Sequence, residues 1–284
     1  MIKRALVLSG GGAKGAFQAG VLRGIALEAG APFEYVTGVS VGALNAAGLA
    51  QFSRDDFTKA TRWIEALWTG GKMDLRRSSF LSYVSGWRRP FLGHNRRLSK
   101  LISSEFDLFR IKTSDVSLLV HAVDLSSGDL RSFGDQSAYL SDDLMACASF
   151  PVAYPPRLVG KRHLTDGATI KIELLKEVIE WGAEHITVIL DADPAAPARA
   201  EIPKTVPSML AHVLDLNSRA AIVHDIQRCQ HINDKLGQYT KIGKRKIDLR
   251  VIAPDHALGD PLDFSAKHIR ALFEAGVKCG KNAK

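Results

Sequence analysis

Near its amino terminus the sequence reads RALVLSGGGAKGAFQAGVLRGIALEA, residues 4–29. The apolar run Arg4–Leu8 predicts a short buried strand, and residues 15–29 carry apolar side chains at helical spacing. Three consecutive glycines, Gly10 to Gly12, and then Gly15 separate the strand from the helix. A strand, a glycine-rich turn and a helix in this order are typical of the first unit of an α/β protein.

The alternation of strands and helices continues along the chain. Strands separated by helices of this length predict one α/β domain, with a mostly parallel central sheet that helices cover on both faces. Further strands are predicted at 35–37, 162–164, 185–190 and 247–252, helices at 43–52, 141–148 and 172–181, and a hairpin of 116–124 with 130–133.

A long helical stretch follows a Pro/Ala-rich loop at 193–207. Its apolar residues repeat at intervals of four and three, which places them on one face of a helix. We expect this stripe to pack in the core rather than to form a binding surface. The residues of the stripe are Met209, Val213, Leu216, Ala220 and Val223.

The composition excludes several classes of protein. The 284 residues are 46% hydrophobic and 24% charged, which is typical of soluble globular proteins. No apolar run is long enough to span a membrane, and the apolar stretch after Lys3 and Arg4 is too short for a secretory signal peptide. Cys147, Cys229 and Cys279 show no zinc-type spacing, so we expect reduced thiols and no metal. These features predict a cytoplasmic location, with a peripheral membrane location as the alternative.

The clearest local signal for chemistry is Gly38-Val39-Ser40-Val41-Gly42, between a predicted strand and a predicted helix. A nucleophilic serine on a strand-to-helix turn needs small neighbours, because the backbone is strained there. Gly38 and Gly42 meet that requirement. A helix that begins just after Ser40 also directs its positive end at any anion formed there. The sequence therefore predicts Ser40 as a nucleophile.

Three interpretations compete for the glycine-rich turn Gly10–Gly15. A dinucleotide fingerprint needs an acid at the end of the second strand, but Glu34 precedes that strand. A phosphate-binding P-loop needs Lys and Ser or Thr at its end, where Ala16 and Phe17 follow Gly15. An oxyanion hole needs backbone amides free of side chains, each contributing about 3 to 4 kcal/mol to transition-state stabilisation. The oxyanion hole fits best, with an ordinary tight turn as the alternative.

A serine nucleophile also needs a base, which is most often histidine. None of the nine histidines lies in a loop flanked by glycines or by an obvious orienting acid. Asp166 instead follows the extended stretch 162–164 and precedes the small residues Gly167 and Ala168. A carboxylate acts as a general base where burial or its neighbours raise its pKa. Asp-Gly is also a common turn, so this string alone leaves both interpretations open.

Together the three strings resemble the patatin-like phospholipase family. Members show a GGGxKG or GGGxRG loop, then a GxSxG string, then Asp-Gly-Gly or Asp-Gly-Ala. Gly10–Gly15, Gly38–Gly42 and Asp166–Ala168 match these strings in that order. Ala168 stands in place of a glycine, a variation that the family tolerates. Residues 148–156 and 261–264 are also similar to bacterial members.

The resemblance spans residues 4–276 as a single domain and leaves 277–284 as a basic tail. It implies a three-layer patatin-like fold and a Ser-Asp dyad, with Ser40 as nucleophile and Asp166 as base. It implies hydrolysis of acyl esters of phospholipids or lysophospholipids through an acyl-enzyme, without metal or cofactor. The oxyanion would be held by the backbone amides of Gly11 and Gly12, helped by Gly10 and Lys14.

The net charge of +8 is concentrated in one segment. Residues 72–100 hold eight basic residues and one acidic residue, interleaved with aromatic and aliphatic side chains. Such a segment binds an anionic membrane surface or single-stranded nucleic acid, or it is a solvated insertion. Beside a lipase-like set of motifs we expect a membrane-facing or substrate-facing cap and no nucleic acid.

Two other functions use the same residues or fold. A lipid acyltransferase would employ the same dyad and pass the acyl group to an alcohol. A basic membrane-binding module would retain the fold without the chemistry, although three intact motifs argue against this alternative.

Overall fold

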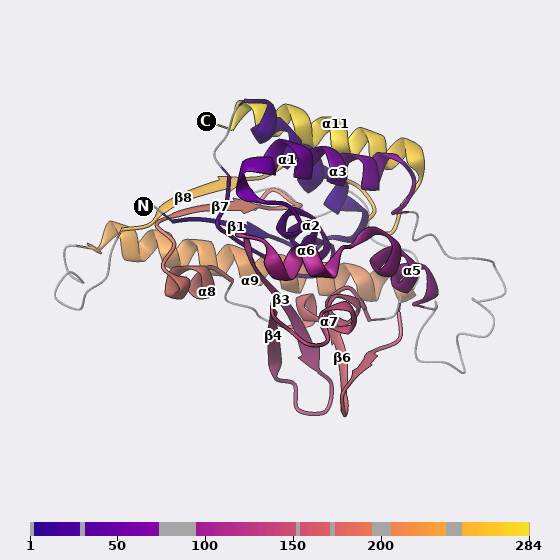
Figure 1. Ribbon diagram of the computed structural model, residues 1–284. Coiled ribbons are helices and arrows are strands. Elements are labelled where there is room, and N and C mark those ends of the chain that lie inside the picture. Colours follow the sequence, from indigo (N-terminus) through magenta and orange to yellow (C-terminus); the bar gives the residue numbers. More distant parts are fainter. Residues whose placement is uncertain are drawn as a thin grey trace.

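A central sheet forms the middle layer of the computed structural model, between two layers of helices (Figure 1). The structure describes residues 3–28, 32–73, 95–151, 154–170, 174–194, 206–236 and 246–283. The parallel strands run in the order β3, β2, β1, β7, β8, and β4, β5 and β6 are antiparallel to their neighbours at one side. Their bounds are β1 (Arg4–Leu8), β2 (Tyr35–Gly38), β3 (Ser117–Asp124), β4 (Leu130–Gly134), β5 (Arg157–Val159), β6 (Arg162–Asp166), β7 (His185–Ile189) and β8 (Asp248–Ile252). The predicted α/β fold with a mostly parallel sheet is confirmed, as is the β3–β4 hairpin.

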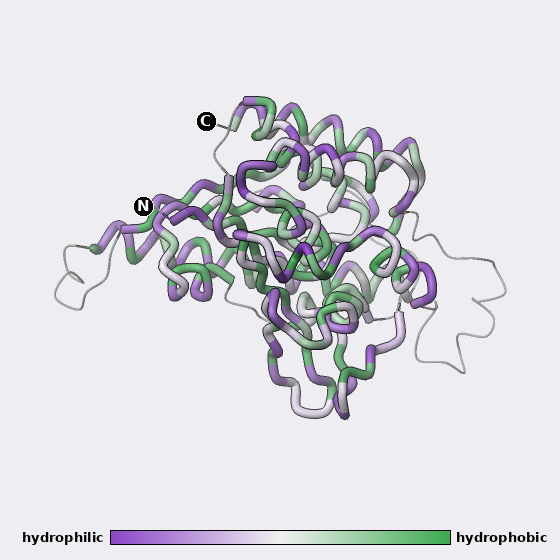
Figure 2. Tube along the Cα trace, viewed as in Figure 1, coloured by the Kyte–Doolittle hydropathy of each residue, from purple (hydrophilic) through white to green (hydrophobic). Residues whose placement is uncertain are grey.

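Helices cover both faces of the sheet, and Figure 1 shows α1, α3 and α11 above it and α8 and α9 below it. The upper layer contains α1 (Gly15–Leu27), α2 (Val41–Ala50), α3 (Phe57–Thr69) and α11 (Ala266–Asn282), and α5 (Arg96–Glu105), α6 (Leu108–Thr113) and α7 (Leu140–Cys147) join the same core. The lower layer contains α8 (Leu174–Trp181) and α9 (Val206–Asp234). The strands and the helix faces against them carry most of the hydrophobic residues (Figure 2).

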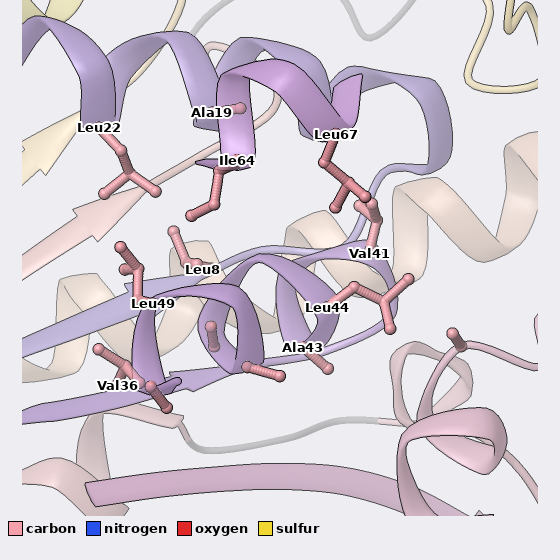
Figure 3. Close-up of a cluster of buried hydrophobic side chains, with 14 of the residues drawn as sticks. Leu8, Ala19, Leu22, Val36, Val41, Ala43, Leu44, Leu49, Ile64 and Leu67 are labelled. Atoms are coloured by element: carbon pink, nitrogen blue, oxygen red, sulfur yellow. The ribbon is translucent and has the colours of Figure 1, made fainter. Parts of the chain in front are cut away.

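Strand β1 shows how the alternation of side chains creates the two cores. Leu6 and Leu8 face the upper layer, whereas Ala5 and Val7 face the lower one. Figure 3 shows Leu8 close to Leu22 of α1 and to side chains of α2 and α3. A strand buried on both faces reads as a continuous apolar run, which is why the sequence predicts it.

The carboxyl ends of β1, β2 and β7 lie side by side. Leu8 is in register with Gly38 on one side and with Ile189 on the other. Ligand sites of open parallel sheets lie at this edge. The segments that follow these strands therefore converge, and they contain Gly10, Ser40 and Asp191.

The predicted helix at 209–223 is confirmed as part of α9, but its predicted packing is wrong. Met209, Val213 and Leu216 are 38%, 50% and 40% exposed. The residues that face the protein are Asp215, which pairs with Lys14, and Ile222, which lies in the lower core. They are seven residues apart, or about two helical turns, so they share a face that the predicted stripe does not occupy.

Two other segments differ from what the sequence predicts. Residues 277–282, expected to be a basic tail, form the last turns of α11 and pack against α1, where a Cβ on Gly280 would lie 2.2 Å from the Val21 carbonyl oxygen. Most of the basic segment 72–100 lies outside the described residues, but α5 begins within it at Arg96 and buries Leu98. Among the described helices, none has both the length and the hydropathy needed to cross a membrane.

Candidate active site

Ser40 occupies the turn between β2 and α2. Its backbone has φ 55° and ψ −129°, and among the described residues it is the one non-glycine residue with positive φ. Strain of this kind costs about 1 to 3 kcal/mol and persists where surrounding contacts fix it. The flanking backbone is tightly packed, because a Cβ on Gly38 would lie 2.6 Å from the Gly42 carbonyl and one on Gly42 would lie 2.5 Å from the Ser9 carbonyl oxygen.

Asp166 lies at the end of β6, opposite Ala122 of β3, and is fully buried. Its Oδ1 accepts a hydrogen bond from the Ala168 amide at 2.9 Å, and its own amide donates to the Ser149 carbonyl oxygen at 3.2 Å. Burial raises the pKa of its carboxyl to about 7, although hydrogen bonding by Ser40 and Ala168 opposes this shift. A carboxyl that titrates near neutral pH has the acidity that a general base needs.

The contact between Ser40 and Asp166 is close but loosely aligned. The Ser40 hydroxyl is near enough to lower the pKa of the carboxyl, yet Oδ2 of Asp166 has no hydrogen bond of regular geometry within the described residues. Catalytic hydrogen bonds are often long or misaligned before substrate binds. Oδ2 is therefore the oxygen available to take a proton.

The three predicted motifs meet at this point. A Cβ on Gly10 would lie 3.1 Å from the Ser40 Cβ and 3.4 Å from the Ala168 Cβ. Within the described residues, the amides of Gly10, Gly11 and Gly12 donate no hydrogen bond. The amide of Val41 begins α2 and has no acceptor within its own helix. Because Gly10 packs against Ser40, the amides of this loop and of Val41 are the candidate donors to an oxyanion formed there. The sequence did not single out Val41.

Lys14 lies in a different environment from the one its place in the motif suggests. Its side chain is almost fully buried, and Nζ pairs with Asp191 Oδ2 at 3.3 Å and with Asp215 Oδ2 at 3.1 Å. The ammonium is thus bound to two carboxylates. The sequence gives no local sign of Asp191 or Asp215, which are 177 and 201 residues away along the chain.

The loop that contains these glycines is also held by the segment 261–264. The Ala13 amide donates to the Pro261 carbonyl oxygen at 2.8 Å. Gly12 has φ +56°, and a Cβ there would lie 2.3 Å from the same oxygen. The Pro261 segment, which is similar in sequence to bacterial family members, therefore holds the glycine-rich loop in place.

One histidine is buried close to these strands. His121 Nε2 lies 2.9 Å from Thr37 Oγ1 and 3.2 Å from Glu177 Oε2, and Nδ1 lies 3.1 Å from Ser132 Oγ. Burial lowers the pKa of His121 to about 4. Its ring nitrogens are occupied by these partners and make no hydrogen bond with Ser40 or Asp166. Within the described ranges, no three His, Cys, Asp or Glu residues gather as metal ligands, and the prediction of chemistry without a metal stays a prediction.

A serine on a strained strand-to-helix turn, beside a buried carboxylate and free backbone amides in an α/β fold, is typical of serine hydrolases. A model of the patatin-like phospholipase family matches residues 6–173. The chain belongs to this family, whose members are lipid acyl hydrolases.

Solved structures with a similar trace include two bacterial proteins. VipD from Legionella pneumophila is 12% identical, with a TM-score of 0.48 over 99% of this chain and 66% of that one. The type III effector protein ExoU is 12% identical, with a TM-score of 0.41 over 100% of this chain and 53% of that one. The chain thus spans about half to two thirds of their length. No curated relative matches the sequence.

Proposed function

We propose that the chain is a serine lipid acyl hydrolase that cleaves acyl esters of phospholipids or lysophospholipids through a Ser40–Asp166 dyad. One observation carries the proposal. The strained nucleophile turn, a fully buried carboxyl with a pKa of about 7, and glycine amides without acceptors lie together at one edge of the sheet.

In the acylation step, Asp166 Oδ2 takes the proton from the Ser40 hydroxyl as Oγ attacks the acyl carbon. The electron pair of the carbonyl moves to its oxygen, and the amides of Gly10, Gly11, Gly12 and Val41 stabilise the resulting negative charge. The tetrahedral adduct then collapses and expels the alkoxide of the lipid. The alkoxide takes the proton from Asp166, which leaves the acyl group esterified to Ser40.

Deacylation repeats these steps with water in place of the serine. Asp166 takes a proton from the water, the hydroxide attacks the acyl carbon, and Ser40 leaves and recovers its proton. An alcohol in place of water gives acyl transfer through the same residues. Chromatography of the products formed with an added acceptor alcohol separates the two reactions, and we propose hydrolysis.

We also propose that the enzyme meets its substrate at an anionic membrane surface, through the basic segment 72–100. The described end of this segment supports the idea. Arg96 and Lys100 of α5 are exposed and, with Arg157, line an open depression of about 450 Å³, while Leu98 on the same helix is buried. The residues 74–94 lie outside the described part of the chain.

The proposal is tested with a chromogenic short-chain ester and with a fluorophosphonate that labels active serines. Ser40→Ala and Asp166→Asn should each lower kcat by at least about 10³-fold, and the double variant should be no worse, because the two residues act as one unit. Labelling should disappear in Ser40→Ala. Ser126→Ala and Asp129→Asn, in the exposed β3–β4 turn, serve as matched controls and should leave turnover unchanged. Unchanged turnover in either dyad variant would overturn the proposal. Failure of the wild-type protein to react with the fluorophosphonate would favour the non-catalytic membrane-binding module.

A further inference from the structure

A buried ion-pair cluster lies directly behind the glycine-rich loop. Lys14 stands at the junction of η1 (Gly12–Lys14) and α1, and its ammonium contacts Asp191, which follows β7, and Asp215 of α9. Lys14 and Asp191 are 3% and 6% exposed. One cation with two carboxylates in the interior is costly unless each group is held and hydrogen-bonded, so the position of each member is strongly fixed.

Asp191 connects this cluster to the loop itself. Its Oδ1 accepts a hydrogen bond from the Ser9 hydroxyl at 3.1 Å, and its amide donates to the same hydroxyl oxygen at 3.1 Å. Its Oδ2, which binds Lys14, lies 2.1 Å from where a Cβ on Gly11 would be. The carboxylate therefore packs against the backbone of Gly11, whose amide is one of the free donors beside Ser40.

The same network reaches the helix that begins after Ser40. Gln18 of α1 donates to the Ser9 carbonyl oxygen at 2.7 Å and accepts from Asn45 Nδ2 at 3.1 Å. Asn45 lies five residues after Ser40 on α2, and its Oδ1 accepts from Trp68 Nε1 at 2.9 Å. A continuous set of buried hydrogen bonds thus fixes the loop relative to the nucleophile helix.

The charges of the cluster bear on the reaction as well. Burial lowers the pKa of Lys14, but Asp191 and Asp215 outweigh this effect and raise the pKa above its usual value, so the ammonium stays charged. Burial raises the pKa of Asp191, and the Lys14 ammonium opposes that rise. The same ammonium lies beside the Asp191 and Asp215 carboxyl groups, behind amides that must stabilise an anion. Lys14 therefore both holds the loop and offsets a negative charge that would oppose the oxyanion.

We infer that Lys14 and Asp191 are positioning residues for the oxyanion loop, and that the Lys14 ammonium acts through Asp191 rather than by contact with the substrate. The inference rests on the proposed function, because it concerns the step in which the oxyanion forms. It replaces the direct contribution of Lys14 to the oxyanion hole that the family resemblance implies.

The first arm of the test is a double-mutant cycle with a soluble chromogenic ester. Displacement of a preorganised group by about 1 Å costs about 10²-fold in rate. Lys14→Met and Asp191→Asn should each lower kcat by about 10²-fold with little change in KM, and the double variant should be no worse than either one. Lys14→Arg retains a charged donor and should recover most of the activity.

The second arm separates positioning from a general loss of structure. A trifluoromethyl ketone analogue forms a tetrahedral oxyanion on Ser40, whereas a non-hydrolysable ether lipid only occupies the site. Lys14→Met and Asp191→Asn should each weaken inhibition by the ketone about 10²-fold relative to wild type. Inhibition by the ether lipid should stay within about twofold of wild type in both variants. Arg23→Met, which breaks the 3.0 Å ion pair between Arg23 of α1 and Glu65 of α3, is the control and should change neither.

Several outcomes would overturn the inference. Full activity in Asp191→Asn together with a large loss in Lys14→Met would mean that Lys14 acts directly on the oxyanion. Equal weakening of inhibition by the ketone and by the ether lipid would mean that the cluster serves folding alone. Thermal unfolding of each variant, including Lys14→Arg, would then show a matching loss of Tm. Failure of the proposed function is seen separately, as turnover that survives in Ser40→Ala.

Discussion

Burial raises the pKa of Asp143 to about 6 and the pKa values of Asp166 and Glu177 to about 7, and of these three carboxyl groups Asp166 lies beside the nucleophile. Glu177 of α8 contacts His121 and accepts from the Ser132 hydroxyl at 3.3 Å, whereas Asp166 lies at Ser40. A pH profile by itself therefore does not say which carboxyl controls the rate.

We predict that kcat/KM for a soluble ester rises with pH through about 7 and then levels off. Below this pH Asp166 is protonated and cannot accept the proton of Ser40, so the rate should fall tenfold for each pH unit below about 6. The control is Glu177→Gln, which removes the other carboxyl with a pKa of about 7. The variant should keep the same midpoint within about half a unit; loss of the rise in this variant would assign the ionisation to Glu177.

At the scale of residues, the motifs identify Ser40 and Asp166 because the chemistry needs small neighbours and a carboxylate at fixed places along the chain. The properties that make Asp166 a suitable base come from its burial at the end of β6, which no local pattern records. The sequence does not predict the ion-pair partners of Lys14 for a similar reason. Asp191 and Asp215 are brought to the loop only by the parallel pairing of β7 with β1 and by α9.

At the scale of elements, the two halves of α9 differ in how far their apolar side chains are exposed. In the first half Met209, Leu210, Val213 and Leu216 are 38% to 50% exposed, whereas Ile222 and Ile226 in the second half are each 6% exposed. Helical spacing indicates which residues share a face, but the buried face is selected by contacts elsewhere, here by Asp215 at Lys14. This is why the sequence predicted the helix correctly and its core face wrongly.

We predict a matching contrast in stability along α9. Leu210→Ala should change the free energy of unfolding by less than about 0.5 kcal/mol, because Leu210 is 44% exposed. Ile226→Ala should cost about 2 to 5 kcal/mol, since it removes a buried side chain from the lower core. Urea denaturation measures both. Similar losses in the two variants would show that the first half of α9 is packed in solution, as the sequence pattern suggested.

The strands of the sheet and helix α11 show where a sequence pattern predicts an element and where it does not. The strands β1 and β7 were predicted because strands buried on both faces are largely apolar, although β7 also carries His185 and Thr187. The last turns of α11 were predicted as a basic tail, because the family resemblance ends at residue 276. The face of α11 against α1 carries Gly276 and Gly280 there rather than large apolar residues. A Cβ on Gly276 would lie 2.1 Å from the Phe17 carbonyl oxygen, so small residues are what this helix pair requires.

At the scale of the whole molecule, the motifs and the sheet topology agree, whereas the distribution of charge raises a separate question. The net charge is +8, and residues 72–100 alone carry +7. The described end of that segment is an amphipathic helix, with Arg96 and Lys100 exposed and Leu98, Leu101 and Ile102 buried. Basic residues near an anionic surface contribute about 1 kcal/mol each to membrane attraction, and salt screens this contribution.

We predict that neutralising Arg88, Arg89, Arg96 and Arg97 lowers activity on anionic phospholipid vesicles by at least about tenfold and removes most of its salt dependence. Hydrolysis of a soluble monomeric ester should stay within about twofold of wild type, because the three catalytic motifs lie outside the segment. A variant that neutralises Lys59, Arg62, Lys267 and Arg270 on α3 and α11 has the same net charge and should retain vesicle activity. Equal losses of activity on vesicles and on the soluble ester would mean that the segment is part of the fold itself. Equal losses of vesicle activity in the two charge variants would show that net charge, rather than this segment, attracts the enzyme to the surface.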